Sequence, residues 1–121
     1  MNVFVLDNST AMIEIYLNKF EKSGIEVNLM TAKNIRIAKE MLNENDFDLI
    51  IMEENIDEEA SGIQFYKEEI KTNFPSIPVL FVSAVNEQED IEMMNEEPVV
   101  VLVKPFGTRK FKSIVSKLIY K

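Results

Sequence analysis

The stretch DLIIMEEN, residues 48–55, decides the fold of this chain. Its four apolar residues follow one another without an intervening polar residue, and the run stops at two acids, Glu53 and Glu54. An unbroken apolar run of this kind is typical of a parallel strand that is covered on both faces. The stretch therefore predicts a buried strand that carries a carboxylate to its own end.

Further segments with strand character lie on both sides of this one. Three have the same unbroken apolar pattern and predict buried strands: residues 3–6, 78–82 and 99–103. A fifth segment, residues 25–30, alternates instead, with Ile25, Val27 and Leu29 expected to face inward. Alternation suits a strand at the edge of a sheet. The chain is therefore predicted to contain five strands, the second of them at an edge.

Helical periodicity fills the segments between and after the strands. Four helices are indicated by apolar residues three or four positions apart: Ile13, Tyr16, Leu17 and Phe20; Ile35, Ala38 and Leu42; Ile63, Tyr66 and Ile70; Phe111, Ile114, Val115, Leu118 and Ile119. Residues 86–97 offer only Ile91, Met93 and Met94, which predicts a short, loosely packed helix. The alternation predicts one α/β domain over residues 1–121, a doubly wound sheet of five parallel strands with five helices.

Composition narrows the possible chemistry. The 121 residues include no cysteine and no histidine, which excludes disulfides, thiolate chemistry and histidine as a general base or metal ligand. Acidic residues outnumber basic ones by 21 to 13, and the net charge of −8 disfavours binding to nucleic acid. No apolar run reaches the roughly 18 residues of a membrane span, and the start lacks a secretory signal. We expect a soluble, cytoplasmic domain that does not bind membranes.

Polar residues follow four of the five predicted strands. Asp7 and Asn8 end the first, Glu53 the third, Ser83 the fourth and Lys104 the fifth. In open α/β sheets, ligands bind at the carboxyl ends of the strands, so these side chains are expected to converge. Two carboxylates can hold a hard cation, and a hydroxyl with an ammonium group can bind a phosphoryl group. The sequence predicts a site for Mg²⁺ and a phosphoryl group.

Several of these residues also have a structural interpretation. Asn8, Ser9 and Thr10 suit the start of the first helix, where such side chains cap free N–H groups. Asp7 could pair with Lys104 in an ion pair that holds no ligand. Both interpretations stay open on the sequence alone.

Four motifs spread over the chain, VFVLDN, DLIIME, PVLFVSA and LVKPF, resemble those of the receiver domain of two-component response regulators. The resemblance implies a flavodoxin-like sheet with strand order 2-1-3-4-5 and a non-enzymatic role in phosphorelay signal transduction. It also implies an aspartate nucleophile after the third strand, an acidic pair that holds Mg²⁺, and a cis bond before Pro105. Ser83 and Lys104 match the hydroxyl and the lysine of the phosphate pocket, and Asp7 matches the first acid.

Three positions depart from the receiver pattern. Asn8 replaces the second acid, Glu53 replaces the phosphate-accepting aspartate, and Val101 stands where an aromatic residue is common. An amide at position 8 removes a negative charge, so Mg²⁺ binding through Asp7, Asn8 and Glu53 is expected to be weak or lost. Glu53 is one methylene too long for near-attack geometry, which costs on the order of a hundredfold in rate. Its carboxylate can instead pair with Lys104 and imitate, in part, a phosphorylated state.

The sequence thus predicts an atypical receiver, a pseudo-receiver that is not efficiently phosphorylated. The resemblance places its contact surface on the fourth helix, fifth strand and fifth helix, for a signalling partner or a second copy of the chain. Acids at 57–59 are expected to repel an anionic phosphodonor. The main alternative is a working, Mg²⁺-dependent phosphoacceptor. A flavodoxin-type cofactor binder is disfavoured, because no Ser/Thr/Gly-rich phosphate loop follows the first strand.

Overall fold

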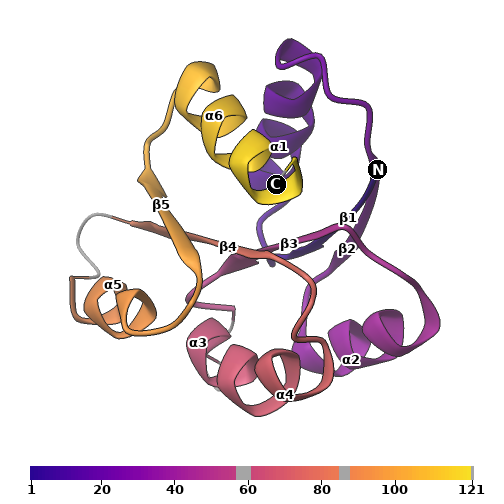
Figure 1. Ribbon diagram of the computed structural model, residues 1–121, viewed down its shortest axis with the longest axis vertical. Coiled ribbons are helices and arrows are strands. Elements are labelled where there is room, and N and C mark those ends of the chain that lie inside the picture. The colour runs from indigo at the N-terminus through magenta and orange to yellow at the C-terminus, as the bar shows by residue number, and fades with distance from the viewer. Residues whose placement is uncertain (57–60, 85–87, 121) are drawn as a thin grey trace.

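The computed structural model describes residues 1–56, 61–84 and 88–120. A five-stranded parallel sheet lies between two layers of helices (Figure 1). The strands are β1 (Asn2–Leu6), β2 (Asn28–Ala32), β3 (Leu49–Glu53), β4 (Val79–Ala84) and β5 (Val100–Lys104). Their order is β2-β1-β3-β4-β5, so the predicted fold class and the edge position of the second strand are confirmed.

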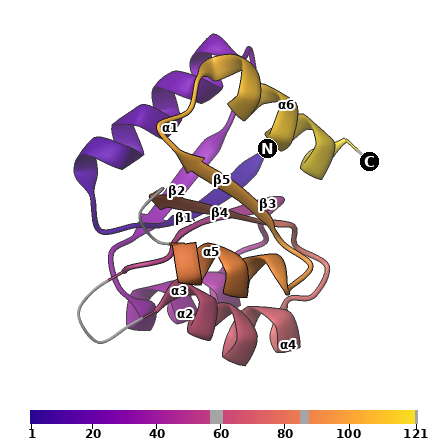
Figure 2. The same ribbon diagram turned by 90° about the vertical axis from the view of Figure 1, so that its left-hand side faces the viewer.

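Helices cover both faces of the sheet (Figures 1 and 2). One face carries α1 (Thr10–Lys22) and α6 (Thr108–Ile119). The other carries α2 (Ile35–Glu44), α3 (Gly62–Phe65), the π-helical segment η1 (Tyr66–Ile70), α4 (Lys71–Asn73) and α5 (Gln88–Asn95). Because α3, η1 and α4 follow one another without a break, they form the predicted third helix, and the predicted fourth and fifth helices are α5 and α6.

The strands separate two hydrophobic clusters by simple alternation. Val5, Ile51 and Leu102 belong to the cluster under α1 and α6, whereas their neighbours along the strands face the other helices. Successive side chains of a strand point to opposite faces, so a residue two positions further along returns to the same face. The pleat therefore directs Asp7, Glu53 and Lys104 toward the α1 and α6 side.

Local signals at both ends of α1 agree with the sequence. Ser9 is the N-cap, and its hydroxyl accepts a hydrogen bond from the Met12 N–H at 3.2 Å. The chain turns after the helix at Gly24, whose φ of 71° lies in the left-handed region that favours glycine.

The expected inward position of Leu17 is wrong, since 46% of this residue is exposed. It lies about 100° around the helix from Tyr16, which is buried.

The second strand begins later than the alternation predicted. It spans Asn28–Ala32, not residues 25–30. β1 begins at Asn2, which pairs with Asn28, so the chain before Asn28 has no strand to pair with. Ile25 and Val27 nevertheless pack against the cluster under α1. The alternation thus identified the inward side chains correctly and placed the hydrogen-bonded ladder too early.

Candidate functional site at the carboxyl edge of the sheet

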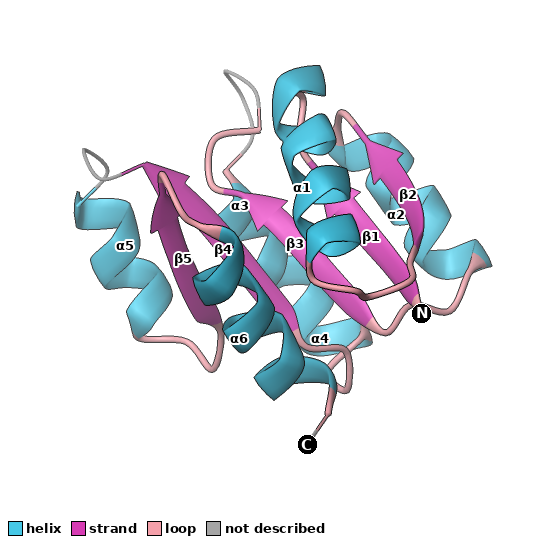
Figure 3. Cartoon of the chain, turned by 90° about the horizontal axis from the view of Figure 1, so that it is seen from above, coloured by secondary structure: helices cyan, strands magenta, loops and turns pink. Residues whose placement is uncertain are grey.

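The predicted site residues gather at one edge of the sheet. All five strands point their carboxyl ends toward that edge (Figure 3). Glu53 lies beside Val82 in the register of β3 and β4, and Lys104 lies beside Ala84 in that of β4 and β5. Glu53 and Ser83 are both buried. Residues from distant parts of the sequence are thus neighbours because parallel strands end together.

The centre of the site is an ion pair. The Lys104 ammonium donates a hydrogen bond to Glu53 Oε2 at 2.7 Å. The pair is mostly shielded, with 29% of the lysine side chain and 9% of the glutamate side chain exposed. The Lys104–Pro105 peptide bond is cis, as the resemblance implied. The sequence prediction that these two charges pair directly is confirmed.

Asp7 lies in the same buried region but binds a different partner. Its Oδ1 accepts a hydrogen bond from the Ser9 N–H at 2.8 Å, and its Oδ2 has no hydrogen-bond partner. Burial raises the pKa of Asp7, which the Ser9 hydrogen bond and the charge of Lys104 lower only in part. The structural alternative of an ion pair between Asp7 and Lys104 is wrong, since Asp7 Oδ1 accepts from Ser9, Oδ2 has no partner, and Lys104 binds Glu53.

Asn8 uses its side chain as a tether. The amide nitrogen Nδ2 donates a hydrogen bond to the backbone carbonyl of Ile56. This bond joins the end of β1 to the segment after β3. A carboxylate at position 8 has no proton to donate and could not make it. The asparagine that replaces the second acid of the receiver pattern therefore has a structural role: it connects the end of β1 to the segment after β3.

Glu54 is a buried residue whose role the sequence did not reveal. Its carboxylate accepts hydrogen bonds from the Ser61 hydroxyl at 2.7 Å and from the Ile63 N–H at 3.1 Å. Its carbonyl accepts from the Gly62 N–H at 2.7 Å. A Cβ on Gly62 would lie 2.3 Å from the Glu53 carbonyl oxygen, so only glycine fits there. Ser61 is the N-cap of α3, and a serine before a helix is a cap signal that the sequence does contain. Nothing in the sequence linked it to an acid seven positions earlier.

The side chains present fit Mg²⁺ poorly. Glu53 Oε2 is bound by Lys104, the amide nitrogen of Asn8 is directed to Ile56, and Asp7 Oδ2 is a buried oxygen without a hydrogen-bond partner. Within the described part of the chain, no three or more acidic residues form a group that could hold a metal ion. Mg²⁺ sites in proteins usually use one or two carboxylates in near-octahedral geometry, and of the two acids here Glu53 is already bound by Lys104.

Two further sequence predictions concern neighbouring segments. Val101, in place of a common aromatic residue, is half-buried and packs against the cluster on the α3 side of the sheet. The acids at 57–59, expected to repel phosphodonors, lie outside the described residues.

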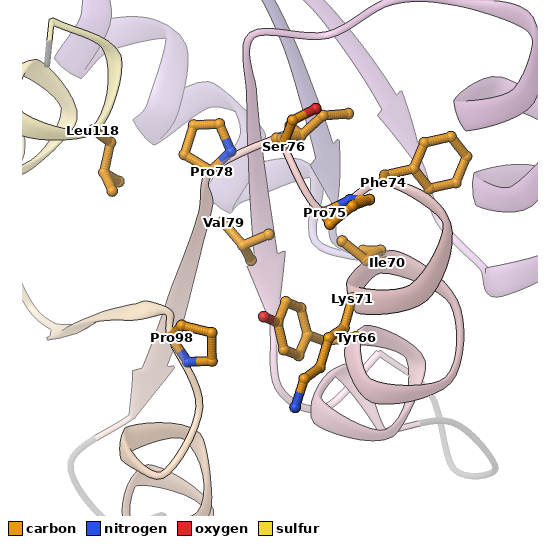
Figure 4. Close-up of a pocket in the computed structure, with 11 residues that line it drawn as sticks. Tyr66, Ile70, Lys71, Phe74, Pro75, Ser76, Pro78, Val79, Pro98 and Leu118 are labelled. Carbon is orange, nitrogen blue, oxygen red and sulfur yellow. The ribbon is translucent and has the colours of Figure 1, made fainter.

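A separate pocket lies at the opposite, amino edge of the sheet (Figure 4). Its volume is about 340 Å³, and three prolines line it, Pro75, Pro78 and Pro98, together with Tyr66. The nearby Lys71 ammonium is bound to Glu97 at 2.7 Å. None of the predicted site residues lines this pocket.

The fold and the site define a class of protein: an α/β domain with a parallel sheet and charged residues at its carboxyl edge. The family model of the response regulator receiver domain matches residues 3–116. The chain therefore belongs to the response regulator receiver domain family, a component of two-component signalling. A search of curated proteins found no match. No helix in the described ranges is long and apolar enough to cross a membrane.

Solved structures of receivers superpose over nearly the whole chain. A response regulator from Thermotoga maritima is 26% identical, with a TM-score of 0.79, covering 99% of this chain and 98% of that one. A receiver domain protein from Clostridium thermocellum is 21% identical, with a TM-score of 0.76 and coverage of 98% and 94%. Full-length FixJ from B. japonicum is 17% identical, with a TM-score of 0.83; the match covers 98% of this chain and 57% of that protein. The last two likenesses concern the fold alone.

Proposed function

We propose that residues 1–121 form an atypical receiver domain, a non-enzymatic module of phosphorelay signalling that is not efficiently phosphorylated. The observation that carries this proposal is the ion pair of Glu53 and Lys104 at 2.7 Å. In a receiver, the acid at this position must attack a phosphodonor with a free carboxylate oxygen. Here the acid is one methylene longer and is bound to the lysine that would otherwise contact the phosphoryl group.

The pair imitates one contact of a phosphorylated receiver. A phosphoryl group brings a charge of about −1.5 to −2 and three acceptor oxygens, whereas Glu53 offers a single charge and two oxygens. The imitation is therefore partial, and it is permanent. The Glu53 side chain holds the domain in one state, so a partner can bind without prior phosphorylation of the domain.

Binding of Mg²⁺ is weak or absent in this proposal. The tether between Asn8 and Ile56 supports it, because the residue in the position of the second acid holds the chain. Ser83 remains the equivalent of the hydroxyl that contacts a phosphoryl group, in a buried position at the end of β4.

The proposed contact surface consists of α5, β5 and α6. β5 is an edge strand, so its outer side can accept a partner. Val101 and Val103 on β5 are half-buried, and Met93 on α5 is 42% exposed. Apolar side chains on an edge suit contact with another protein, either a signalling partner or a second copy of this chain.

Incubation with acetyl phosphate and Mg²⁺, followed by intact-mass measurement, tests the proposal. We expect no gain of a phosphoryl group and no change in amide chemical shifts on addition of beryllofluoride with Mg²⁺. The variant Glu53→Gln is the control. A clear response in the parent that this variant abolishes would establish the alternative, a working phosphoacceptor, and would overturn the proposal.

The double variant Glu53→Asp with Asn8→Asp tests the assignment of the positions. It restores both acids of the receiver pattern, so it should bind Mg²⁺ more tightly than the parent protein, as measured by calorimetry. Each single variant is its control. Equal affinities in the parent and the double variant would mean that these residues do not occupy the metal positions.

A further inference from the structure

Two buried oxygen atoms near the candidate site have no hydrogen-bond partner. In the described part of the chain, three buried side-chain atoms lack one: Asp7 Oδ2, the Tyr16 hydroxyl and the Ser23 hydroxyl. Asp7 is 1% exposed and Tyr16 is fully buried. The large majority of buried polar atoms in proteins are paired, with protein or with ordered water. Two unpaired atoms in one region therefore call for a shared explanation.

Sequence position and helix geometry direct these two side chains toward the same region. Asp7 precedes α1, which begins at Thr10, and Tyr16 lies in the second turn of that helix. Long helical side chains lean back toward the helix N-terminus, so the Tyr16 ring extends toward Asp7. Tyr16 also packs in the cluster that contains Val5 and Ile51, and alternation places Asp7 and Glu53 on this same face.

The effect of charge on the phenol agrees with this placement. Burial raises the pKa of Tyr16, and the negative charges of Asp7 and of Glu53 raise it further. This influence agrees with the position of Asp7 just before α1 and of Tyr16 within that helix. The phenol therefore keeps its proton at working pH and is a hydrogen-bond donor.

Stacking fixes the orientation of the ring. Phe106 stacks on Tyr16, with ring centroids 6.5 Å apart and an interplanar angle of 11°. Phe106 stacks in turn on Phe111 of α6, at 5.8 Å and 15°. Because Phe106 follows Lys104 by two residues, the same short segment holds both the ammonium that binds Glu53 and the ring that steadies Tyr16.

We propose that Tyr16 is a positioning residue of this site: through one bound water molecule, its hydroxyl hydrogen-bonds to Asp7 Oδ2 and holds that carboxylate in place. The two oxygens are not hydrogen-bonded to each other directly. A buried water typically makes two to four hydrogen bonds to polar groups that are otherwise unsatisfied. The proposal rests on the proposed function, because water can take this position only while no metal ion or phosphoryl group does.

The phenol would thus give Asp7 a permanent, neutral partner. In the receiver pattern a divalent cation stabilises the acids at this edge. Here Lys104 neutralises Glu53, and the Ser9 N–H donates a hydrogen bond to Oδ1 of Asp7. The Tyr16 hydroxyl binds the other oxygen, Oδ2, through the water molecule. Tyr16 therefore completes a site that is held in a single arrangement by the side chains of the chain itself.

NMR of Tyr16→Phe tests the proposal, because phenylalanine keeps the ring and its stacking and removes only the hydroxyl. If Tyr16 positions Asp7, loss of the hydroxyl will change the hydrogen bond between the Ser9 N–H and Asp7 Oδ1. We expect clear shifts of the Ser9 amide proton and of the Asp7 carboxyl carbon. The matched control is Tyr66→Phe, which removes a hydroxyl from a buried tyrosine that packs against Phe81 on the other face.

A second measurement changes Asp7 and observes Tyr16. With ¹³C at the tyrosine Cζ atoms, Asp7→Ala should move the Tyr16 signal and leave those of Tyr66 and Tyr120 in place. An unchanged Ser9 amide in Tyr16→Phe, an equal change in Tyr66→Phe, or an unmoved Tyr16 signal in Asp7→Ala would overturn the proposal. No phosphodonor or Mg²⁺ is present, so failure here is distinct from failure of the proposed function.

Discussion

The two edges of the sheet each contain a Lys–Glu ion pair with the same separation of 2.7 Å. At the carboxyl edge, Lys104 binds Glu53, with 29% and 9% of the side chains exposed. At the amino edge, Lys71 binds Glu97, with 51% and 11% exposed, and Lys67 adds a second, longer contact to Glu97. Equal distances do not mean equal energies, because the strength of an ion pair depends on how much water surrounds it.

The carboxylates at the two edges also differ in the main cause of their pKa shifts. Burial raises the pKa of Asp7 at the carboxyl edge. At the amino edge, the hydrogen bond from Lys71 lowers the pKa of Glu97. One edge thus holds acids that the fold shields from water, and the other holds an acid stabilised by exposed lysines. The more shielded pair joins the ends of β3 and β5, whereas the pair of Lys71 and Glu97 joins α4 to the segment before β5.

The largest expected difference between the edges comes from removing each lysine. Lys104→Met leaves the Glu53 charge buried without its partner and should lower the free energy of unfolding by about 2–4 kcal/mol. Lys71→Met, the matched control, leaves Glu97 beside Lys67 and water, so a much smaller loss is expected. Urea denaturation of both variants measures the difference. Equal losses would mean that burial does not distinguish the pairs.

The close packing of the carboxyl edge can be tested at a glycine. In Gly62→Ala the new Cβ meets the backbone of Glu53, which should cost about 1–3 kcal/mol of stability. Gly107→Ala is the control, because no atom lies within 4 Å of a Cβ there. Thermal unfolding of both variants compares them. A Gly62→Ala protein as stable as the control would show that the segment after β3 shifts freely.

The buried acid provides a test by pH. Because the pKa of Asp7 is raised above its ordinary 3.8, the folded protein holds this proton more readily than the unfolded chain. Its contribution to stability therefore falls as the pH rises from about 3.8 through the folded pKa. Asp7→Asn should be more stable than the parent at pH 7, by about 1 kcal/mol, and this advantage should vanish near pH 3.8. Denaturation of both proteins at a series of pH values measures this. If the difference in stability between Asp7→Asn and the parent stayed constant from pH 3.8 to pH 7, burial of the charged carboxylate would not be its cause.

Glu97, the acid at the amino edge, should show the opposite dependence of stability on pH and the smallest effect. The pKa of Glu97 is lowered from 4.5, so its contribution is fully present above pH 4.5 and is lost as the pH falls through the folded pKa. Glu97→Gln should therefore be slightly less stable than the parent at pH 7 and equal to it in acid. Salt should weaken this difference, since the lysines that pair with Glu97 are exposed and their charges are screened. If Glu97→Gln were more stable than the parent at pH 7, the acid at the amino edge would behave like Asp7, and the two edges would not differ in this way.

The sequence predicted most of the framework and part of the site. Unbroken apolar runs located the central strands, because strands covered on both faces need apolar residues at every position. Residues at the strand ends then identified Glu53 and Lys104 as neighbours. The second ladder was placed too early, since its start depends on where β1 begins, and alternation within residues 25–30 says nothing of that.

The sequence by itself determined the sheet, its order and the unusual length of the acid at position 53. Only the tertiary structure decided which atoms meet: Asn8 with Ile56, Glu54 with Ser61 and Ile63, and Tyr16 with Phe106. Periodicity reflects the face on which a side chain lies, which local backbone geometry sets. A hydrogen bond between distant segments depends on the packing of whole elements, and no local pattern records it.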